Sequence, residues 1–233
     1  MWNTTQCRSR WMSRKSRMSL EIIHIESRED WLREREKIRG IGGSDAAAAI
    51  GMSKRKTMVQ LWQEKTGRVK PKDLSGVEYV QMGVRTEGPM RDLFAALHPE
   101  YAAIHRPYDI YHQTEAPGIF ATLDGELTDK ATGEKGVLEI KKFDVKSRED
   151  WKLWDNRVPD DYFCQVLHQM SATGYAFAWL WAVLLRQDGR GELRPYFFPR
   201  EEYEADLREL REKEMKFLRY VQEDRVPPAS LRI

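Results

Sequence analysis

The sequence predicts a mixed α/β or α+β fold in which a central sheet is flanked by helices. Two observations lead to this fold class. Apolar residues recur at helical spacing up to Leu97 and again towards the C-terminal end, whereas short strand-like runs bounded by turn residues follow Ala102. The resulting order of helices, strands, a helix, a strand pair and a helix is typical of one domain whose sheet is covered by helices.

Helix boundaries follow from capping residues and from glycines. Ser27 and the acidic residues after it predict a helix at about 29–38, which Gly40 ends. Ser44 is expected to cap a short alanine-rich helix at 45–50. Further helices are expected at 57–65, at 77–97 with an interruption at Gly88 and Pro89, at 160–172, and in a charged last segment with an apolar stripe at Tyr203, Leu207, Leu210, Phe217 and Val221.

Strands are expected where the apolar pattern shortens and turn residues bound it. The expected strands are 103–112, 119–123, 127–130, 136–143, 175–186 and 193–198. The turn residues at 187–190 predict that the last two strands form a hairpin.

The length of 233 residues suits a single domain, expected at 21–225, with tails at 1–20 and 226–233. The first 18 residues carry five basic residues and no acid. This composition predicts a disordered tail, or an extension upstream of a chain that starts at Met18. A basic arm that touches nucleic acid is the alternative.

The composition excludes several classes of protein. A net charge of +2, from 39 basic and 37 acidic residues, excludes binding to nucleic acid by bulk positive charge, although not by a local basic stripe. Two cysteines, Cys7 and Cys164, exclude a disulfide framework and favour the reducing cytoplasm. The longest apolar run, 175–185, is too short to span a membrane, for which roughly 20 residues are needed.

The residues that point to chemistry are Asp124, Glu139 and Lys141. In a strand at 136–143, Glu139 and Lys141 project to one side, while Leu138 and Ile140 point into the core. Two carboxylates and a backbone carbonyl are oxygen ligands suited to Mg²⁺, and a lysine beside the metal can hold or activate the attacking water. Taken alone the pattern is weak, because Glu and Lys alternate on the solvent face of many edge strands.

Other segments add support. The glycines before Ser44 form a backbone ready to bind an anion, and Arg35 and Arg39 lie one helical turn apart just upstream. A carboxylate, Glu87, precedes the strands on a helix, and the amides of Gln165 and Gln169 follow them on an apolar helix. The five histidines have no metal-ligand spacing and are expected to be surface or core residues; His168, three residues after Gln165, is the one worth testing.

Residues 31–182 contain a series of motifs in a fixed order: GIGGSDAAAAIG, LWQEKTG, MGVRTEGPMRDLF, LDG, LEIKKF and DYFCQVLHQM. In these motifs the sequence resembles the lambda exonuclease and YqaJ-type phage recombination exonucleases of the PD-(D/E)XK nuclease superfamily. The resemblance implies a restriction-endonuclease-like core with a central mixed sheet. It also implies an exonuclease, dependent on Mg²⁺ or else Mn²⁺, that digests one strand of linear duplex DNA from its 5′ end and leaves 3′ single strands.

The resemblance also implies roles for individual residues. The metal ligands would be Asp124, Glu139 and the backbone carbonyl of Ile140, with Glu87 serving the metal centre from its helix. Lys141 would position or activate the attacking water, and Leu123 stands where the name of the superfamily has proline.

Three further roles concern the substrate and the geometry of the site. Gln165 would help to orient the catalytic residues. Ser44 would meet the 5′ phosphate together with an upstream arginine, and the spacing leaves open whether that arginine is Arg35 or Arg39.

The implied partners are duplex DNA ends, a single-strand annealing protein and further copies of the chain in a ring, a trimer by the resemblance. The implied location is the cytoplasm of the bacterial host of a phage or prophage. Two alternatives stay open: an endonuclease of the same superfamily, and a non-catalytic DNA-end-binding scaffold for recombination. On this interpretation, the near-neutral charge is a sum of opposed patches, with acids at the metal site offset by basic residues around it.

Overall fold

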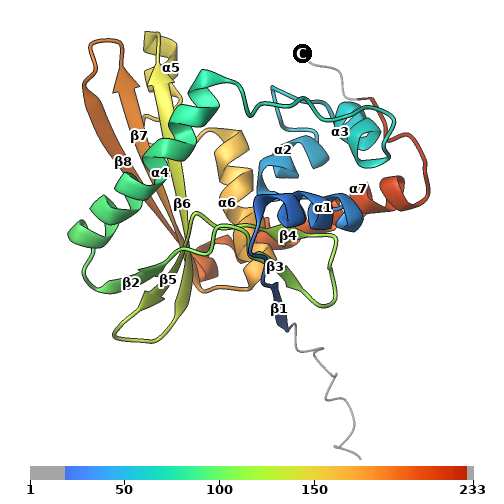
Figure 1. Ribbon diagram of the computed structural model, residues 1–233, viewed down its shortest axis with the longest axis horizontal. Helices are drawn as coiled ribbons and strands as arrows, with labels where there is room; N and C mark the ends of the chain where they lie inside the picture. The colour runs from blue at the N-terminus through green and yellow to red at the C-terminus, as the bar shows by residue number, and fades with distance from the viewer. Residues whose placement is uncertain (1–18, 230–233) are drawn as a thin grey trace, which may run out of the picture.

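The computed structural model describes residues 19–229 and has helices on both faces of a five-stranded sheet (Figure 1). The strands run in the order β2-β5-β6-β7-β8, with bounds Tyr101–Ile104, Gly125–Asp129, Lys135–Val145, Phe177–Arg186 and Gly191–Pro199. Neighbouring strands are antiparallel except β6 and β7, which are parallel. This mixed sheet flanked by helices confirms the predicted fold class.

A second, three-stranded antiparallel sheet in the order β1-β3-β4 lies beside the first; its strands are Leu20–Ile23, Ile110–Gln113 and Phe120–Ala121. The single strand predicted at 103–112 is therefore wrong. It is two strands, β2 and β3, that belong to different sheets. Pro107 lies between them, and a proline has no N–H to donate to a sheet.

The helices are α1 (Arg28–Ile38), α2 (Ala46–Ala49), α3 (Met58–Lys65), α4 (Glu78–Leu97), α5 (Arg148–Lys152), α6 (Asp160–Thr173) and α7 (Glu204–Gln222). The interruption predicted at Gly88 and Pro89 is wrong, because α4 continues through both residues. Pro89 costs a hydrogen bond, but Met90 and Phe94 hold the next turn against the sheet. Ser44 caps no helix either: it lies inside a 3-10 turn, Gly43–Asp45, that no side chain caps.

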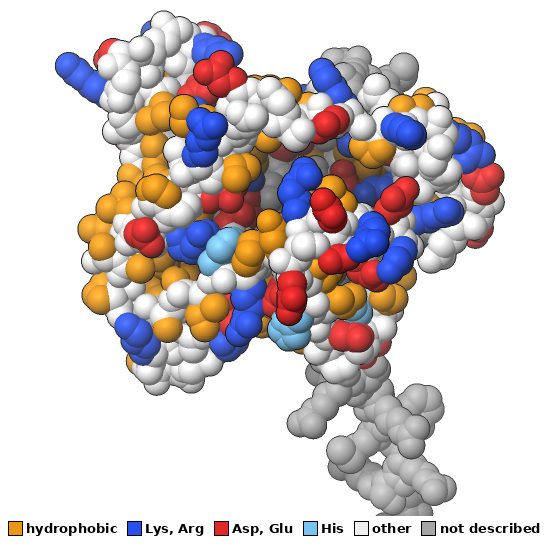
Figure 2. Space-filling view, in the orientation of Figure 1, with side chains coloured by type: hydrophobic (Ala, Val, Ile, Leu, Met, Phe, Trp, Pro, Cys, Tyr) orange, Lys and Arg blue, Asp and Glu red, His pale blue; other side chains and the backbone are white. Residues whose placement is uncertain are grey.

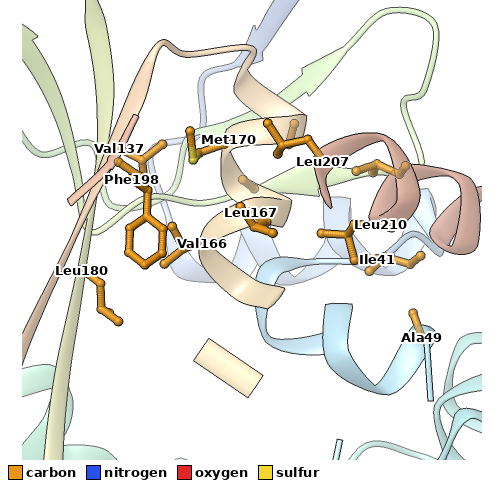
Figure 3. Packing of buried hydrophobic residues seen from close by; sticks show 14 of the residues in the cluster. Ile41, Ala49, Val137, Val166, Leu167, Met170, Leu180, Phe198, Leu207 and Leu210 are labelled. Carbon is orange, nitrogen blue, oxygen red and sulfur yellow. The ribbon is translucent and has the colours of Figure 1, made fainter. Parts of the chain in front are cut away.

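The main core lies around α6 (Figure 3). Val166, Leu167 and Met170 project from α6 between the sheet and α7. The sheet contributes Val137, Leu180 and Phe198 to this cluster, and α7 contributes Leu207 and Leu210. On the other face of the sheet, Phe94 of α4 packs with Leu138, Ile140 and Trp181. Strand β6 is thus held between α4 and α6, and this position decides where its charged residues can point.

The basic segment 1–18 lies outside the described residues, so its expected role stays a prediction. Between Ser19 and Ala229, no helix combines the length and the apolar character that a membrane crossing requires.

Candidate active site

The side chains of β6 alternate as the sequence predicted. Leu138 and Ile140 pack in the cluster with α4, whereas Glu139 contacts residues of α6 on the opposite face. Lys141 shares that face and forms an ion pair with Glu139 Oε1. The strand therefore places an acid and a base side by side on the face that α6 covers.

The buried carboxylate of Glu139 has three donors around it. Only 1% of the residue is exposed to solvent. Gln165 Nε2 donates to Oε1 at 2.6 Å, and Gln169 Nε2 donates to Oε2 at 2.5 Å. Burying a carboxylate is costly unless donors or cations compensate it. The two amides of α6 and the Lys141 ammonium supply that compensation, so the carboxylate is held in one orientation.

Asp124 lies in the loop between β4 and β5 and is fixed at both its side chain and its backbone. Its Oδ2 accepts a 2.8 Å hydrogen bond from the amide of Ile140, on the strand that carries Glu139. Its carbonyl oxygen accepts hydrogen bonds from Arg91 Nη1 at 2.7 Å and from His105 Nδ1 at 3.0 Å. These bonds tie the loop to α4 and to β6.

The electrostatics of the cluster are those of carboxylates crowded together. Burial, and then the charge of Glu139, raise the pKa of Asp124 well above its usual range, although Lys141 opposes the shift. Burial and the charge of Glu139 also raise the pKa of Glu87, on α4. Burial alone would lower the pKa of Lys141, but Glu139 and Asp124 together raise it above its ordinary value. The cluster therefore repels further negative charge and would be relieved by a cation.

The donor set fits a hard divalent cation. Asp124, Glu139 and Glu87 present carboxylate oxygens, which together with backbone carbonyls and water are the ligands of Mg²⁺. Among residues 19–229, however, no three side chains of His, Cys, Asp or Glu are placed to hold one metal ion together. A cation here would therefore need the carbonyl of Ile140 and water as well as the two carboxylates of Asp124 and Glu139.

A cavity of about 620 Å³ opens in front of this cluster. Figure 2 shows it as a hollow with acidic side chains at its bottom and basic side chains near its edge. The acidic part includes Asp124 and Glu87. The remaining walls carry arginines, aromatic rings and a glycine-rich turn: Arg28, Arg35, Arg85, Arg91, Trp31, Tyr108, Phe120, Gly42, Gly43 and Ser44. A site with cations on one wall and carboxylates at the bottom suits an anionic substrate that a metal ion also contacts.

Of the two arginines that the sequence left open, only Arg35 lines this cavity. Its guanidinium lies 4.3 Å from the ring centre of Trp31 and 5.7 Å from that of Phe120. Arg39 is exposed and lines a different hollow, together with Arg68 and Leu218. Arg35 makes no ion pair with any described residue, and Asp45 is the anion whose charge acts on it from a longer distance.

Several cavity residues were given no functional role by the sequence. The amide of Gln169 was noted without a role, and Arg91 could have been found, because each lies one helical turn after a predicted site residue, Gln165 and Glu87 respectively. His105 lies in the segment expected to be a strand, so its position in the sequence did not indicate a functional role. The hydrogen bond from Trp31 Nε1 to Thr122 Oγ1 is 3.0 Å long and joins α1 to the segment before Asp124. This contact joins segments far apart in the sequence.

Replacing Gly43 with alanine should lower the rate of the nuclease reaction that the sequence motifs imply by about tenfold or more. Small misplacements of catalytic groups have effects of this size. A Cβ at residue 43 would lie 3.1 Å from Cγ of Gln165, the side chain that holds Glu139. A Cβ at Gly83, on α4, meets nothing within 4 Å, so Gly83→Ala is the matched control. Initial rates and thermal melting of both variants test this, and equal rates for the two would contradict it.

Comparison with known proteins identifies relatives of this chain. The model of the YqaJ-like viral recombinase domain matches residues 30–176. The chain is similar to the uncharacterized protein YqaJ of Bacillus subtilis (strain 168), with 34% identity over 148 residues. The match covers 64% of this chain and 43% of YqaJ, so the chain spans less than half the length of that relative.

Two solved structures have a similar fold. The alkaline exonuclease of Laribacter hongkongensis superposes with a TM-score of 0.58 at 19% identity, over 84% of this chain and 93% of that one. A second structure of this alkaline exonuclease, LHK-Exo, in complex with dAMP gives a TM-score of 0.57 at 17% identity, over the same shares of the two chains. These likenesses confirm the restriction-endonuclease-like core that the sequence motifs implied.

Proposed function

Because the chain belongs to the YqaJ-like viral recombinase family, we propose that it is a deoxyribonuclease that removes nucleotides from one strand of linear duplex DNA. The observation that carries the proposal is the cluster formed by Asp124, Glu139 and Lys141, of which Asp124 lines a cavity with cationic walls. A phosphodiester is anionic, and its hydrolysis requires stabilisation of further negative charge. The cationic walls would bind the anionic phosphodiester, and the acidic cluster, together with a cation, would stabilise the further negative charge.

Each residue of the cluster has its own role in the proposed reaction. A divalent cation, Mg²⁺ or else Mn²⁺, held by Asp124, Glu139 and the Ile140 carbonyl would polarise the scissile phosphate and stabilise its developing charge. Lys141, fixed against Glu139, would hold the attacking water by donating a hydrogen bond to it. Gln165 orients Glu139 through its 2.6 Å hydrogen bond. Glu87, on α4, adds a further negative charge to the cluster and would help to hold the cation.

The cationic wall supports attack from a 5′ end. Arg35 lies over the rings of Trp31 and Phe120 and makes no ion pair among the described residues, and Ser44 lines the same cavity. A terminal 5′ phosphate is the anion that this wall would receive while the neighbouring phosphodiester faces the carboxylates. The product would then be a duplex with a 3′ single strand, the substrate of a single-strand annealing protein. A ring of copies in the bacterial cytoplasm belongs to the same proposal.

Digestion of end-labelled linear duplex tests the proposal. One set of substrates carries a 5′ phosphate and another a 5′ hydroxyl, each with Mg²⁺ or with a chelator. We expect Mg²⁺-dependent release of the 5′ label, faster from phosphorylated ends, and no cleavage of covalently closed circular duplex. Cleavage of the circle would indicate an endonuclease instead, and binding of ends without turnover would indicate a scaffold.

Replacing Arg35 with glutamine should reduce the preference for 5′-phosphorylated ends by about tenfold or more, since charge-assisted hydrogen bonds contribute about 1.5–3 kcal/mol. Arg39→Gln is the matched control, because it removes the same charge from a residue four positions later that does not line the cavity. The ratio of rates on phosphorylated and hydroxyl ends is the quantity to measure. A larger effect of Arg39→Gln on that ratio would assign the phosphate to the other arginine.

A further inference from the structure

One flank of α7 carries an unusual set of cations. Arg208, Arg211, Lys216 and Arg219, here called the cationic flank, follow one another at intervals of three, five and three residues and line one surface hollow. Residues three apart lie on the same side of a helix, and at about 100° per residue the four residues fall within a sector of roughly 140°. From Arg208 to Arg219 the flank advances eleven residue steps, which corresponds to about 16 Å along the helix axis.

The cations of this flank differ from their neighbours in having no ion pair with any residue between Ser19 and Ala229. By contrast, Lys213, which lines the same hollow, has its Nζ 2.6 Å from Glu209, and Arg200 Nε lies 3.0 Å from Glu204. Glu212 is the single acid that lines the hollow. Like charges one helical turn apart destabilise a helix. A helix required only to be soluble would not need four unpaired cations around one hollow, so these cations point to an external anion.

The cationic flank is separated from the candidate active site. Helix α6 lies between them: its Gln165 contacts Glu139 in the site, and its other side packs against Leu207 and Leu210 of α7. No residue of the flank lines the cavity in front of Asp124. An anion bound at α7 would therefore lie on a different surface from a DNA end in the cavity.

We propose that the cationic flank of α7 is a second nucleic-acid contact, which binds the phosphate backbone of DNA outside the cavity. The proposal rests on the proposed function for the identity of the polyanion. Phosphates spaced along a strand match a row of cations along a helix, whereas a single small anion would not need about 16 Å of helix. The exposed thioether of Met215 lies among the cations and offers an apolar contact to the sugar backbone.

Binding to closed circles tests the flank without using the cavity, because a circle has no end to place there. Single-stranded and duplex circles are titrated with the full chain in chelator at several salt concentrations. The test variant is Arg211→Gln/Lys216→Gln/Arg219→Gln, in which glutamine keeps a good helix propensity. The charge-matched control is Lys130→Gln/Arg190→Gln/Arg225→Gln, which removes three exposed cations from three other places.

For the test variant we expect affinity for circular DNA to fall at least about tenfold. The slope of log affinity against log salt should become shallower by about 2 to 3, as expected when three phosphate contacts are lost. The control variant should keep most of the affinity for circular DNA and most of its dependence on salt. Equal losses in the two variants, or no binding of circles by the unmodified chain, would overturn the proposal. Because nothing is cleaved in this assay, a failure of the nuclease proposal would appear separately, as absent digestion of linear DNA.

Discussion

Replacing Glu139 with glutamine is expected to reduce DNA cleavage by at least about a thousandfold, the scale seen when a catalytic group is removed. Glutamine keeps the shape of the side chain and one oxygen that can accept a hydrogen bond, so Gln165 or Gln169 still has an acceptor. The negative charge that offsets Lys141 and that would hold a cation is lost. Single-turnover rates on linear duplex with saturating Mg²⁺ measure the effect.

The matched control is Glu134→Gln, because Glu134 precedes the same strand but is exposed. It should cleave at the unmodified rate. Circular dichroism and binding of DNA ends in chelator show whether the Glu139 variant remains folded and competent to bind. A folded Glu139→Gln or Glu139→Ala protein that digests DNA at the unmodified rate would refute the assignment of the site.

The part of the site that the sequence could predict is the part governed by local periodicity. The two-residue repeat of a strand places Glu139 and Lys141 on one side and Leu138 and Ile140 on the other. The structure has this arrangement. The spacing of four residues on α6 likewise places Gln165 and Gln169 on one side of the helix, and both reach Glu139. That both amides bind Glu139 depends on how α6 packs onto β6, and no local sequence pattern predicts that packing.

The choice between Arg35 and Arg39 shows why local spacing can fail. Four residues apart, the two arginines would share one helix face if α1 continued. The helix ends at Ile38, and Arg39 adopts a left-handed backbone conformation with φ of 48°. The chain turns at that residue, so the Arg39 side chain leaves the face that Arg35 occupies. The difference lies in one backbone dihedral at a helix end, where propensities are weakest.

The small sheet was the least predictable part of the fold. Strand β1 has only four residues and pairs with β3, about 90 positions later in the chain, with Leu20 opposite Gln113. Such a short edge strand is stabilised by its distant partner more than by its own propensity. The two-residue strand β4 is similar, yet it determines the position of the chain just before Asp124. The helices predicted at 29–38, 57–65 and 160–172 and the strands at 136–143 and 175–186 needed no such distant information.

Replacing Glu214 with glutamine is expected to destabilise the folded protein by about 3 kcal/mol, because it removes one partner of a buried ion pair. Glu214 of α7 and His168 of α6 have fully buried side chains, and Glu214 Oε1 lies 2.6 Å from His168 Nδ1. His168 Nε2 lies 2.8 Å from the carbonyl oxygen of Phe120, in β4. Both acceptors can be satisfied only when both ring nitrogens carry protons, so the imidazolium joins α7, α6 and β4.

The pH dependence of the stability that Glu214→Gln removes distinguishes a contribution of this ion pair from one of packing alone. Burial lowers the pKa of His168, but the charge of Glu214 and the hydrogen bonds raise it above its ordinary value of 6.5. A group with a raised pKa in the folded state contributes its stability fully below the unfolded value and loses it as pH rises through the folded value. The destabilisation by Glu214→Gln, measured by urea unfolding, should therefore be larger at pH 6 than at pH 9. Glu209→Gln, which breaks an exposed pair on the same helix, should change stability little at either pH; a Glu214 effect that is independent of pH would show that the ion pair does not hold these elements together.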